Sequence, residues 1–175
     1  GHVSFAVSCN AAAQAEFNRG MAMLHSFWFD PAIKSFKSVL AQDPSCGMAH
    51  WGIAFMSIGN PFAWPANPKA MQNGAQAIAE AERTGAKTER EQAYIAALSG
   101  FFRDWENVPH RTRAVALQKS MEALAARYPN DDEAQVLHAL LLDATALPTD
   151  KTFANQLRAA AILEPMFRKH PDHPE

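Results

Sequence analysis

Soft metal ligands and thiols are the side chains with the clearest capacity for chemistry. His25 and His50 fall in neighbouring predicted helices, and Met21, Met23 and Met48 are close to them in the sequence. Imidazole and thioether groups together suit a copper ion. The two histidines, however, fall at different heights along their helices, and the HExxH and CxxC spacings of common metal sites are absent. We therefore expect neither a metal ion nor another cofactor.

The two cysteines each precede a predicted helix. Cys9 and Cys46 are too few for a disulfide scaffold. They leave two alternatives open, a single bridge or two buried thiols. A bridge needs Cα atoms about 4.4–6.8 Å apart, a distance that the sequence does not supply. If it forms, it pins the N-terminal segment to the second helix pair and implies an oxidising compartment.

The sequence contains none of the common catalytic or nucleotide-binding motifs. The nucleophile elbow, the P-loop and the Gly-rich dinucleotide loop are all absent, so the sequence predicts no enzyme. The acidic run 131–133 is typical of a helix N-terminus, where negative charge favours the helix dipole. Arg19 is expected to point between helices and to pair with Glu16, Asp30 or Asp43, because a buried charge demands a partner.

Composition favours a packed helical domain that binds neither nucleic acid nor lipid. The 175 residues fit one domain, and 48% of them are hydrophobic against 19% charged. A net charge of −2 argues against nucleic acid, whose phosphates need a clustered positive field. No apolar run reaches the length of about 18 residues that spans a bilayer.

Apolar residues at helical spacing, separated by turn signals, predict helices throughout. Asp30-Pro31 is typical of a helix start, and Thr88 with Glu91 forms a capping-box pattern. The proline-rich stretch 60–68 is incompatible with regular helix. Its rings Phe62 and Trp64 either present an aromatic contact to a partner or fold back over the second helix pair, and the second alternative is favoured. The helices are expected at residues 11–29, 31–43, 46–58, 69–83, 88–102, 109–128, 131–146 and 152–169.

An internal repeat favours a solenoid over a globular bundle. Phe17 and Trp51 are separated by 34 positions, and so are the small residues Gly20 and Ala54. A second pattern joins a small or apolar residue, an apolar residue four positions later, and a proline eight positions after that. It occurs at Ala32, Phe36 and Pro44, at Leu117, Met121 and Pro129, and at Ala159, Leu163 and Pro171.

These patterns resemble the tetratricopeptide repeat, in which a small residue of the first helix is followed by Ala-x3-Phe and a closing Pro in the second. Gly20, Ala32, Phe36 and Pro44 match it in register, while Glu16 and Arg19 stand where an aromatic and a Leu are usual. The sequences of residues 27–33 and 170–174 resemble those of uncharacterised, exported bacterial proteins with such repeats. The helix pairs are expected at 11–44, 46–86, 88–129 and 131–171.

The resemblance implies an all-α solenoid of antiparallel helix pairs, one domain over 1–175, that binds another polypeptide in its concave groove. Its first helices would line this groove with Phe17, Met21, Leu24, His25, Met48, Trp51 and Phe55. The alternatives are that these side chains are core, or that the same pocket binds a small ligand or a metal. A periplasmic or secreted location is expected, otherwise a cytoplasmic one. Because no helix follows Pro171, we expect the chain to continue beyond Glu175, or a partner to cover this end.

Overall fold

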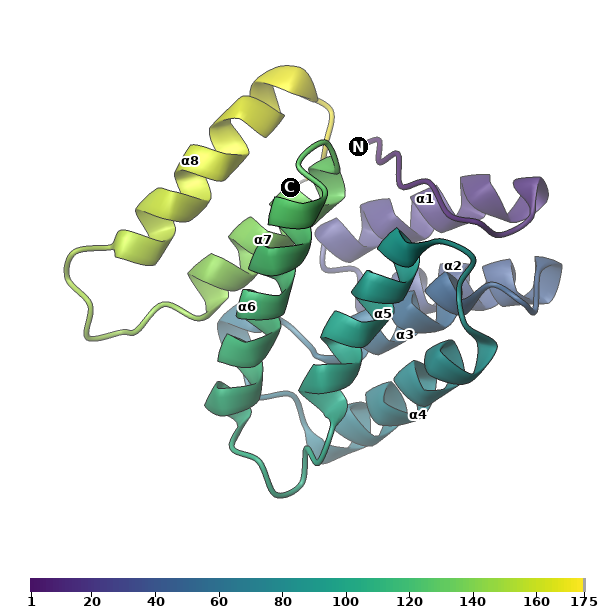
Figure 1. Ribbon diagram of the computed structural model, residues 1–175, viewed down its shortest axis with the longest axis horizontal. Helices are drawn as coiled ribbons and strands as arrows, with labels where there is room; N and C mark the ends of the chain where they lie inside the picture. The colour runs from purple at the N-terminus through teal and green to yellow at the C-terminus, as the bar shows by residue number, and fades with distance from the viewer. Residues whose placement is uncertain (175) are drawn as a thin grey trace. The chain divides into compact units, whose positions relative to one another are not determined.

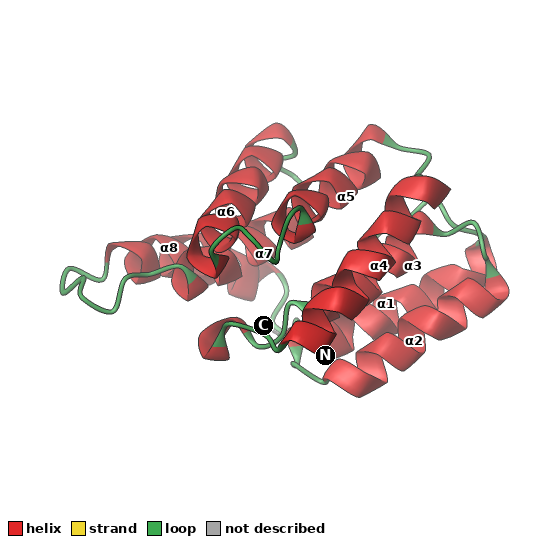
Figure 2. Cartoon of the chain, turned by 90° about the horizontal axis from the view of Figure 1, so that it is seen from below, coloured by secondary structure: helices red, strands yellow, loops and turns green. Residues whose placement is uncertain are grey.

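The computed structural model describes residues 1–174, and helices are the regular secondary structure within them, joined by loops and turns (Figure 2), which confirms the all-α prediction. Glu175, and with it the expected continuation of the chain, lies outside the described residues. The elements are α1 (Ala11–His25), α2 (Phe29–Gln42), α3 (Gly47–Ser57), the short 3-10 helix η1 (Pro61–Ala63), α4 (Pro68–Thr84), α5 (Glu89–Phe102), α6 (His110–Arg127), α7 (Asp132–Ala144) and α8 (Ala154–Lys169).

Local capping chemistry sets several of the helix starts. The side chains of Asn10, Thr88 and Asp131 each accept a hydrogen bond from a backbone N–H in the first turn of α1, α5 and α7. The Thr88 hydroxyl also donates to the Glu91 carboxylate at 2.7 Å, so the predicted capping pair is present. Satisfying these otherwise unpaired N–H groups explains why the three helices begin where they do.

The turn between α1 and α2 differs from the expectation. Helix α1 ends at His25 instead of residue 29, and Phe27 adopts a left-handed backbone with φ of 54°. Helix α2 then begins at Phe29, so Asp30 lies in its first turn and is not the cap. The left-handed residue reverses the chain within three positions, which brings the two helices together as an antiparallel pair.

The described chain divides into two compact units. Unit 1 holds Gly1–Arg103 with the residues from His173 onwards, and unit 2 holds Asp104–Asp172. The boundary falls inside the predicted third pair, 88–129, and places α5 in unit 1 and α6 in unit 2. Asp104, the first residue of unit 2, has a left-handed backbone with φ of 51°, which ends the continuous helical path.

Within unit 1, α1 packs on α2 and α3 packs on α4, while α3 also contacts α1, α2 and α5 (Figure 1). The ring of Phe36 in α2 lies against the backbone of α1 and α3 at two glycines. A Cβ added at Gly20 would meet this ring at 2.7 Å, and one at Gly52 would meet it at 2.6 Å. Only glycine therefore lets the aromatic side chain approach both helices so closely.

The proline-rich stretch supplies one half-buried ring, Trp64, and one exposed ring, Phe62, to unit 1. Trp64 stacks on Phe101 with centroids 6.0 Å apart and donates its indole N–H to the Ile58 carbonyl at 2.6 Å. Phe62, by contrast, is 57% exposed and meets Phe27 edge-on. The expected folding back thus holds for Trp64 and not for Phe62.

Unit 2 contains α6, α7 and α8, and α7 packs on each of the other two. The contact of α7 with α8 rests on a small core of Ala139, Leu142 and Ala159, with Ile162 and Leu163 half-buried against it. Leu157 and Phe167 of α8 are more than 60% exposed. Among residues 1–174, no helix combines the length and the apolar character needed to cross a membrane.

Candidate functional site

The side chains predicted to line an open groove are all buried. Their exposed fractions are 0% for Phe17, Met21 and Met48, 1% for Leu24 and Trp51, and 3% for His25 and Phe55. The structure therefore corrects the prediction of an open contact surface. For Phe17 and Trp51 the physical reason is that an N-terminal residue of the same chain, Phe5, lies against both rings.

Phe5 belongs to residues 3–8, here called the docked segment. Val3 and Phe5 are buried, whereas Ser4 and Ala6 between them are exposed. Alternation of buried and exposed side chains is the pattern of an extended chain lying on a surface. The segment runs beside α1 in Figure 1, where it is the purple coil near the N-terminus.

Phe5 fills the space above the aromatic floor. Its ring lies 5.5 Å from Phe17 of α1, 6.0 Å from Trp51 of α3 and 5.1 Å from Tyr94 of α5, measured between centroids. On another side, the guanidinium carbon of Arg90 is 4.4 Å from the Phe5 centroid, which is cation–π distance. One side chain of the docked segment therefore contacts α1, α3 and α5.

Helix α1 forms one wall and binds the backbone of the segment through two side-chain amides. The Phe5 N–H donates to Asn18 Oδ1 at 3.2 Å. Gln14 donates from Nε2 to the Phe5 carbonyl at 2.8 Å and accepts from the Val7 N–H at Oε1 at 3.0 Å. In an extended chain these three backbone groups face the same side, so the two amides act as a neighbouring strand would.

Helix α5 forms the opposite wall. Arg90 donates from Nη1 to the Ala6 carbonyl at 2.9 Å, and Glu91 accepts from the Ser8 N–H at 2.7 Å. The Ser8 hydroxyl donates to the second Glu91 oxygen at 2.6 Å. Residues 6 and 8 thus face α5, while residues 5 and 7 face α1. We call the surface covered by the docked segment the groove, with walls α1 and α5 and a floor on α3.

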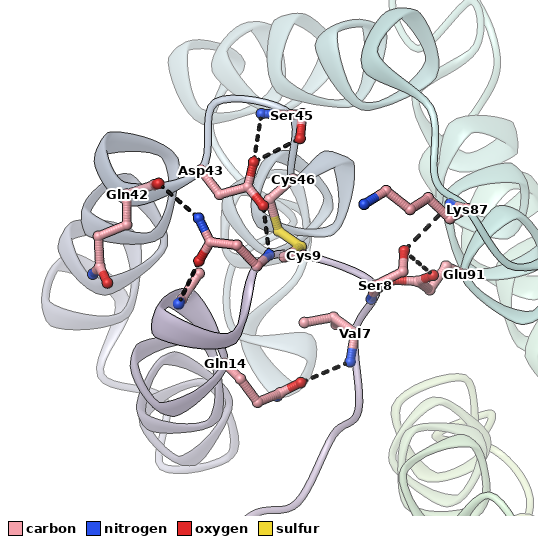
Figure 3. The surroundings of a disulfide bond; sticks show 12 residues. Val7, Ser8, Cys9, Gln14, Gln42, Asp43, Ser45, Cys46, Lys87 and Glu91 are labelled. Atoms are coloured by element: carbon pink, nitrogen blue, oxygen red, sulfur yellow. Dashed lines mark hydrogen bonds between the residues drawn. A yellow bond between two sulfur atoms is a disulfide. The ribbon is translucent and has the colours of Figure 1, made fainter.

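The structure closes the downstream end of the docked segment with a disulfide. Cys9 is bonded to Cys46, with the two Cα atoms 5.0 Å apart (Figure 3). Cys46 is 1% exposed, whereas Cys9 is partly exposed. The bond attaches the residue after Ser8 to the start of α3, which carries the groove floor.

Asp43 orders the same end of the segment. Its carboxylate accepts from the Asn10 N–H at 2.6 Å and from the Ser45 hydroxyl at 2.6 Å. The hydrogen bond from Ser45, followed by that from Asn10, holds the pKa of the Asp43 carboxyl below its usual range, although burial opposes the shift. Asp43 is therefore ionised at neutral pH and fixes the chain at the junction between the docked segment and α1.

A cavity of about 240 Å³ adjoins the disulfide. Cys9, Ser8, Lys87 and Glu91 contribute to its lining. In Figure 3 the Lys87 side chain extends from its backbone towards the two sulfur atoms. Cys9 lines this cavity, whereas Cys46 is buried. A small molecule can therefore reach the disulfide from the side of Cys9 and not from the side of Cys46.

The docked segment is held by a near balance of opposing terms. Ordering the backbone of residues 3–8 costs about 1.5 kcal/mol per residue, or about 9 kcal/mol. Burying Val3 and Phe5 returns about 2 kcal/mol each. The backbone hydrogen bonds to the two walls add about 1 kcal/mol each, or about 5 kcal/mol. These terms nearly cancel, and the Ser8 hydroxyl bond to Glu91 and the Arg90–Phe5 cation–π contact leave a small surplus that favours docking before the disulfide is counted.

Two histidines and an arginine remain among the residues that the sequence analysis singled out. His25 is buried at the end of α1, and its ring meets His173 with centroids 4.8 Å apart. Burial lowers the pKa of His50 below its usual range; the charge of Glu80 opposes this shift and that of Arg83 adds to it. Arg19 pairs with Glu16 at 3.7 Å, as predicted, but its side chain is 66% exposed, so its predicted position between helices is wrong.

Sequence reasoning missed the groups that hold the docked segment, namely Gln14, Asn18, Arg90 and Glu91. It also left residues 3–8 out of the fold. One signal was available, because the apolar residues Val3, Phe5 and Val7 recur with the period of two that indicates an extended chain. Nothing local indicated where that chain would bind.

Comparisons with protein-family models, curated proteins and solved structures find no match to this chain. The argument for function therefore rests on the groove and its occupant.

Proposed function

We propose that unit 1 is a polypeptide-binding module whose groove takes an extended peptide with an aromatic side chain. The observation that carries the proposal is the docked segment itself, which occupies the groove as such a ligand would. Backbone hydrogen bonds to the walls give affinity for any extended chain, and the pocket around Phe5 selects one side chain. A scaffold, an assembly factor and a non-catalytic subunit all use this kind of site.

The proposed architecture behind this function is a tetratricopeptide-like solenoid of antiparallel helix pairs. Its support is the packing of α1 on α2 and of α3 on α4, with the Phe36 ring against Gly20 and Gly52. In this register α1, α3 and α5 are first helices, the ones that line the concave face of such a solenoid. The docked segment contacts these three helices, as the register requires of a concave-face ligand.

We propose an oxidising compartment, periplasmic or extracellular, as the place where the protein works. The support is the Cys9–Cys46 disulfide, since disulfides form and persist outside the reducing cytosol.

The direct test removes the built-in ligand from the full chain and asks whether the groove accepts a peptide in its place. The variant Phe5→Asp removes the buried ring and places a carboxylate against Phe17, Trp51 and Tyr94. The cost of taking this charge out of water outweighs what pairing with Arg90 returns, so the segment is released. A fluorescent peptide with the sequence of residues 1–8 is then titrated with this variant. The proposal predicts a saturable rise in fluorescence anisotropy.

Two controls make the result specific. The same peptide carrying Phe5→Asp should show no binding, and circular dichroism should show that the variant chain keeps its helical content. If the folded variant fails to bind the natural peptide, the groove is a structural seat for residues 3–8 and the proposed function is wrong.

A further inference from the structure

The two ends of the docked segment are held by different kinds of interaction, non-covalent at the upstream end and covalent at the downstream end. Upstream, Val3 and Phe5 are held by burial and by hydrogen bonds to side chains. Downstream, a covalent bond joins Cys9 to Cys46 next to the last docked residue, Ser8. Because the non-covalent terms leave only a small surplus over the cost of ordering, the segment stays in the groove when both the Phe5 contacts and the covalent attachment are present.

We propose that the Cys9–Cys46 disulfide is a redox-sensitive tether that keeps the groove closed, and that its reduction by a dithiol opens the groove to another polypeptide. The incoming partner is an extended chain with an aromatic residue in the place of Phe5. This inference rests on the proposed function, since an opened groove matters only if it binds peptides.

Access to the bond favours reduction from one side. The cavity of about 240 Å³ is lined by Cys9 and is large enough to admit a small thiol. Lys87 lines the same cavity, and its ammonium group attracts an incoming thiolate. Cys46, at 1% exposed, is shielded. The geometry therefore directs attack to the sulfur of Cys9.

The exchange proceeds in two balanced steps. A thiolate of the dithiol attacks Cys9 Sγ, the Cys9–Cys46 bond breaks, and Cys46 leaves as a thiolate that takes up a proton. The second thiolate of the dithiol then attacks the first dithiol sulfur, the one bonded to Cys9 Sγ. This attack expels Cys9 as a thiolate, which also takes up a proton. The dithiol is oxidised to a cyclic disulfide, and the two electrons it loses reduce the protein bond to two thiols.

After reduction, the peptide bond to Asn10 is the one covalent connection between the docked segment and the fold. The Asn10 N–H still bonds Asp43, so the start of α1 remains ordered while residues 3–9 gain freedom. The segment remains a competitor at millimolar effective concentration, because it is still part of the same chain. A partner peptide therefore gains access to the groove after reduction, although it must displace a weakened intramolecular ligand.

Peptide binding to the natural full chain tests the tether. The labelled peptide of residues 1–8 is titrated with the oxidised chain and again after treatment with dithiothreitol. We expect the apparent affinity to rise by at least about tenfold on reduction. The matched control is the double variant Cys9→Ser with Cys46→Ala, which should bind as tightly as the reduced chain whether or not dithiothreitol is present.

Hydrogen exchange on the same samples separates opening from unfolding. Reduction should accelerate exchange at Phe5, Val7 and Ser8 while the amides of α3 and α5 keep their protection. If reduction exposes α3 and α5 as well, the disulfide is a structural bond only and the inference is wrong. It is also wrong if the peptide binds equally before and after reduction, or if two chains exchange their segments and elute as a dimer.

The failures of the two proposals are distinguishable. If the Phe5→Asp variant binds the peptide but the natural chain does not respond to dithiothreitol, the groove is a peptide site and the tether inference is overturned. If the Phe5→Asp variant binds no peptide, the proposed function falls first, and a reductant-dependent signal from the natural chain then has another origin.

Discussion

The two units attach a peripheral element by different physical means. In unit 1 the docked segment is fixed by a buried aromatic ring, by hydrogen bonds to its backbone and by a disulfide. In unit 2 helix α8 buries only Ala159 fully, and exposed ion pairs join it to α6 and α7. The first attachment is concentrated in a few strong contacts that a single change can remove, whereas the second is spread over many weak ones.

The largest expected effect is on the groove floor. Trp51 is 1% exposed and contacts Phe5, Phe55 and Tyr94, so Trp51→Ala should lower the free energy of unfolding of unit 1 by about 3–5 kcal/mol. Urea denaturation followed by circular dichroism measures the loss. The matched change in unit 2 is Leu157→Ala, on a side chain 66% exposed, which should cost no more than about 0.5 kcal/mol. Equal losses would erase the contrast between the units.

The disulfide comes next. Removing it with Cys9→Ser and Cys46→Ala should cost about 2–5 kcal/mol, because the bond links residues 37 positions apart and restricts the unfolded chain. Thermal unfolding of the oxidised natural chain and of the double variant provides the measurement. A loss below about 1 kcal/mol would show that the disulfide contributes little to the stability of unit 1.

Acid should weaken the junction at Asp43 by a smaller amount. The pKa of Asp43 in the folded state is lowered below 3.8, so its contribution is fully present above that pH and is lost as the pH falls through the folded value. We expect the stability of the natural chain to fall with acid more steeply below pH 3.8 than that of Asp43→Asn, which cannot titrate. Parallel pH profiles of the two proteins would show that Asp43 contributes nothing there.

The smallest effect is expected at the ion pairs of α8. Arg158 lies 2.8 Å from Glu122, but both side chains are about half exposed, so water and salt screen the pair. Arg158→Ala should change the free energy of unfolding by no more than about 0.5 kcal/mol, and the difference should vanish at high salt. A larger, salt-independent loss would mean that unit 2 also depends on concentrated contacts.

Helix starts were predictable because their causes are local. Thr88 and Glu91 lie within one turn of each other, and their capping interaction is visible in the sequence alone. The register also put Phe17 and Trp51 on one surface, and Phe5 does contact both. The separation of 34 positions was enough to identify two of the residues that line the groove, one on α1 and one on α3.

The occupant was not predictable, because it depends on pairings between distant positions. Ser8 bonds Glu91 across 83 positions, and Ala6 bonds Arg90 across 84. No local pattern in residues 3–8 names these partners. The boundary between the two units falls in the loop expected between the helices at 88–102 and 109–128. The sequence indicated this loop but not that the chain divides there, because the division depends on contacts between distant positions.

Residue-resolved hydrogen exchange of the oxidised natural chain tests the central claim most directly, because the claim is that residues 3–8 occupy the groove. The account predicts that the amides of Phe5, Val7 and Ser8, which donate to Asn18, Gln14 and Glu91, exchange slowly, and that Phe5→Ala releases all three together. Exchange at the rate of an unstructured peptide in the natural chain would contradict it and leave the groove without its ligand.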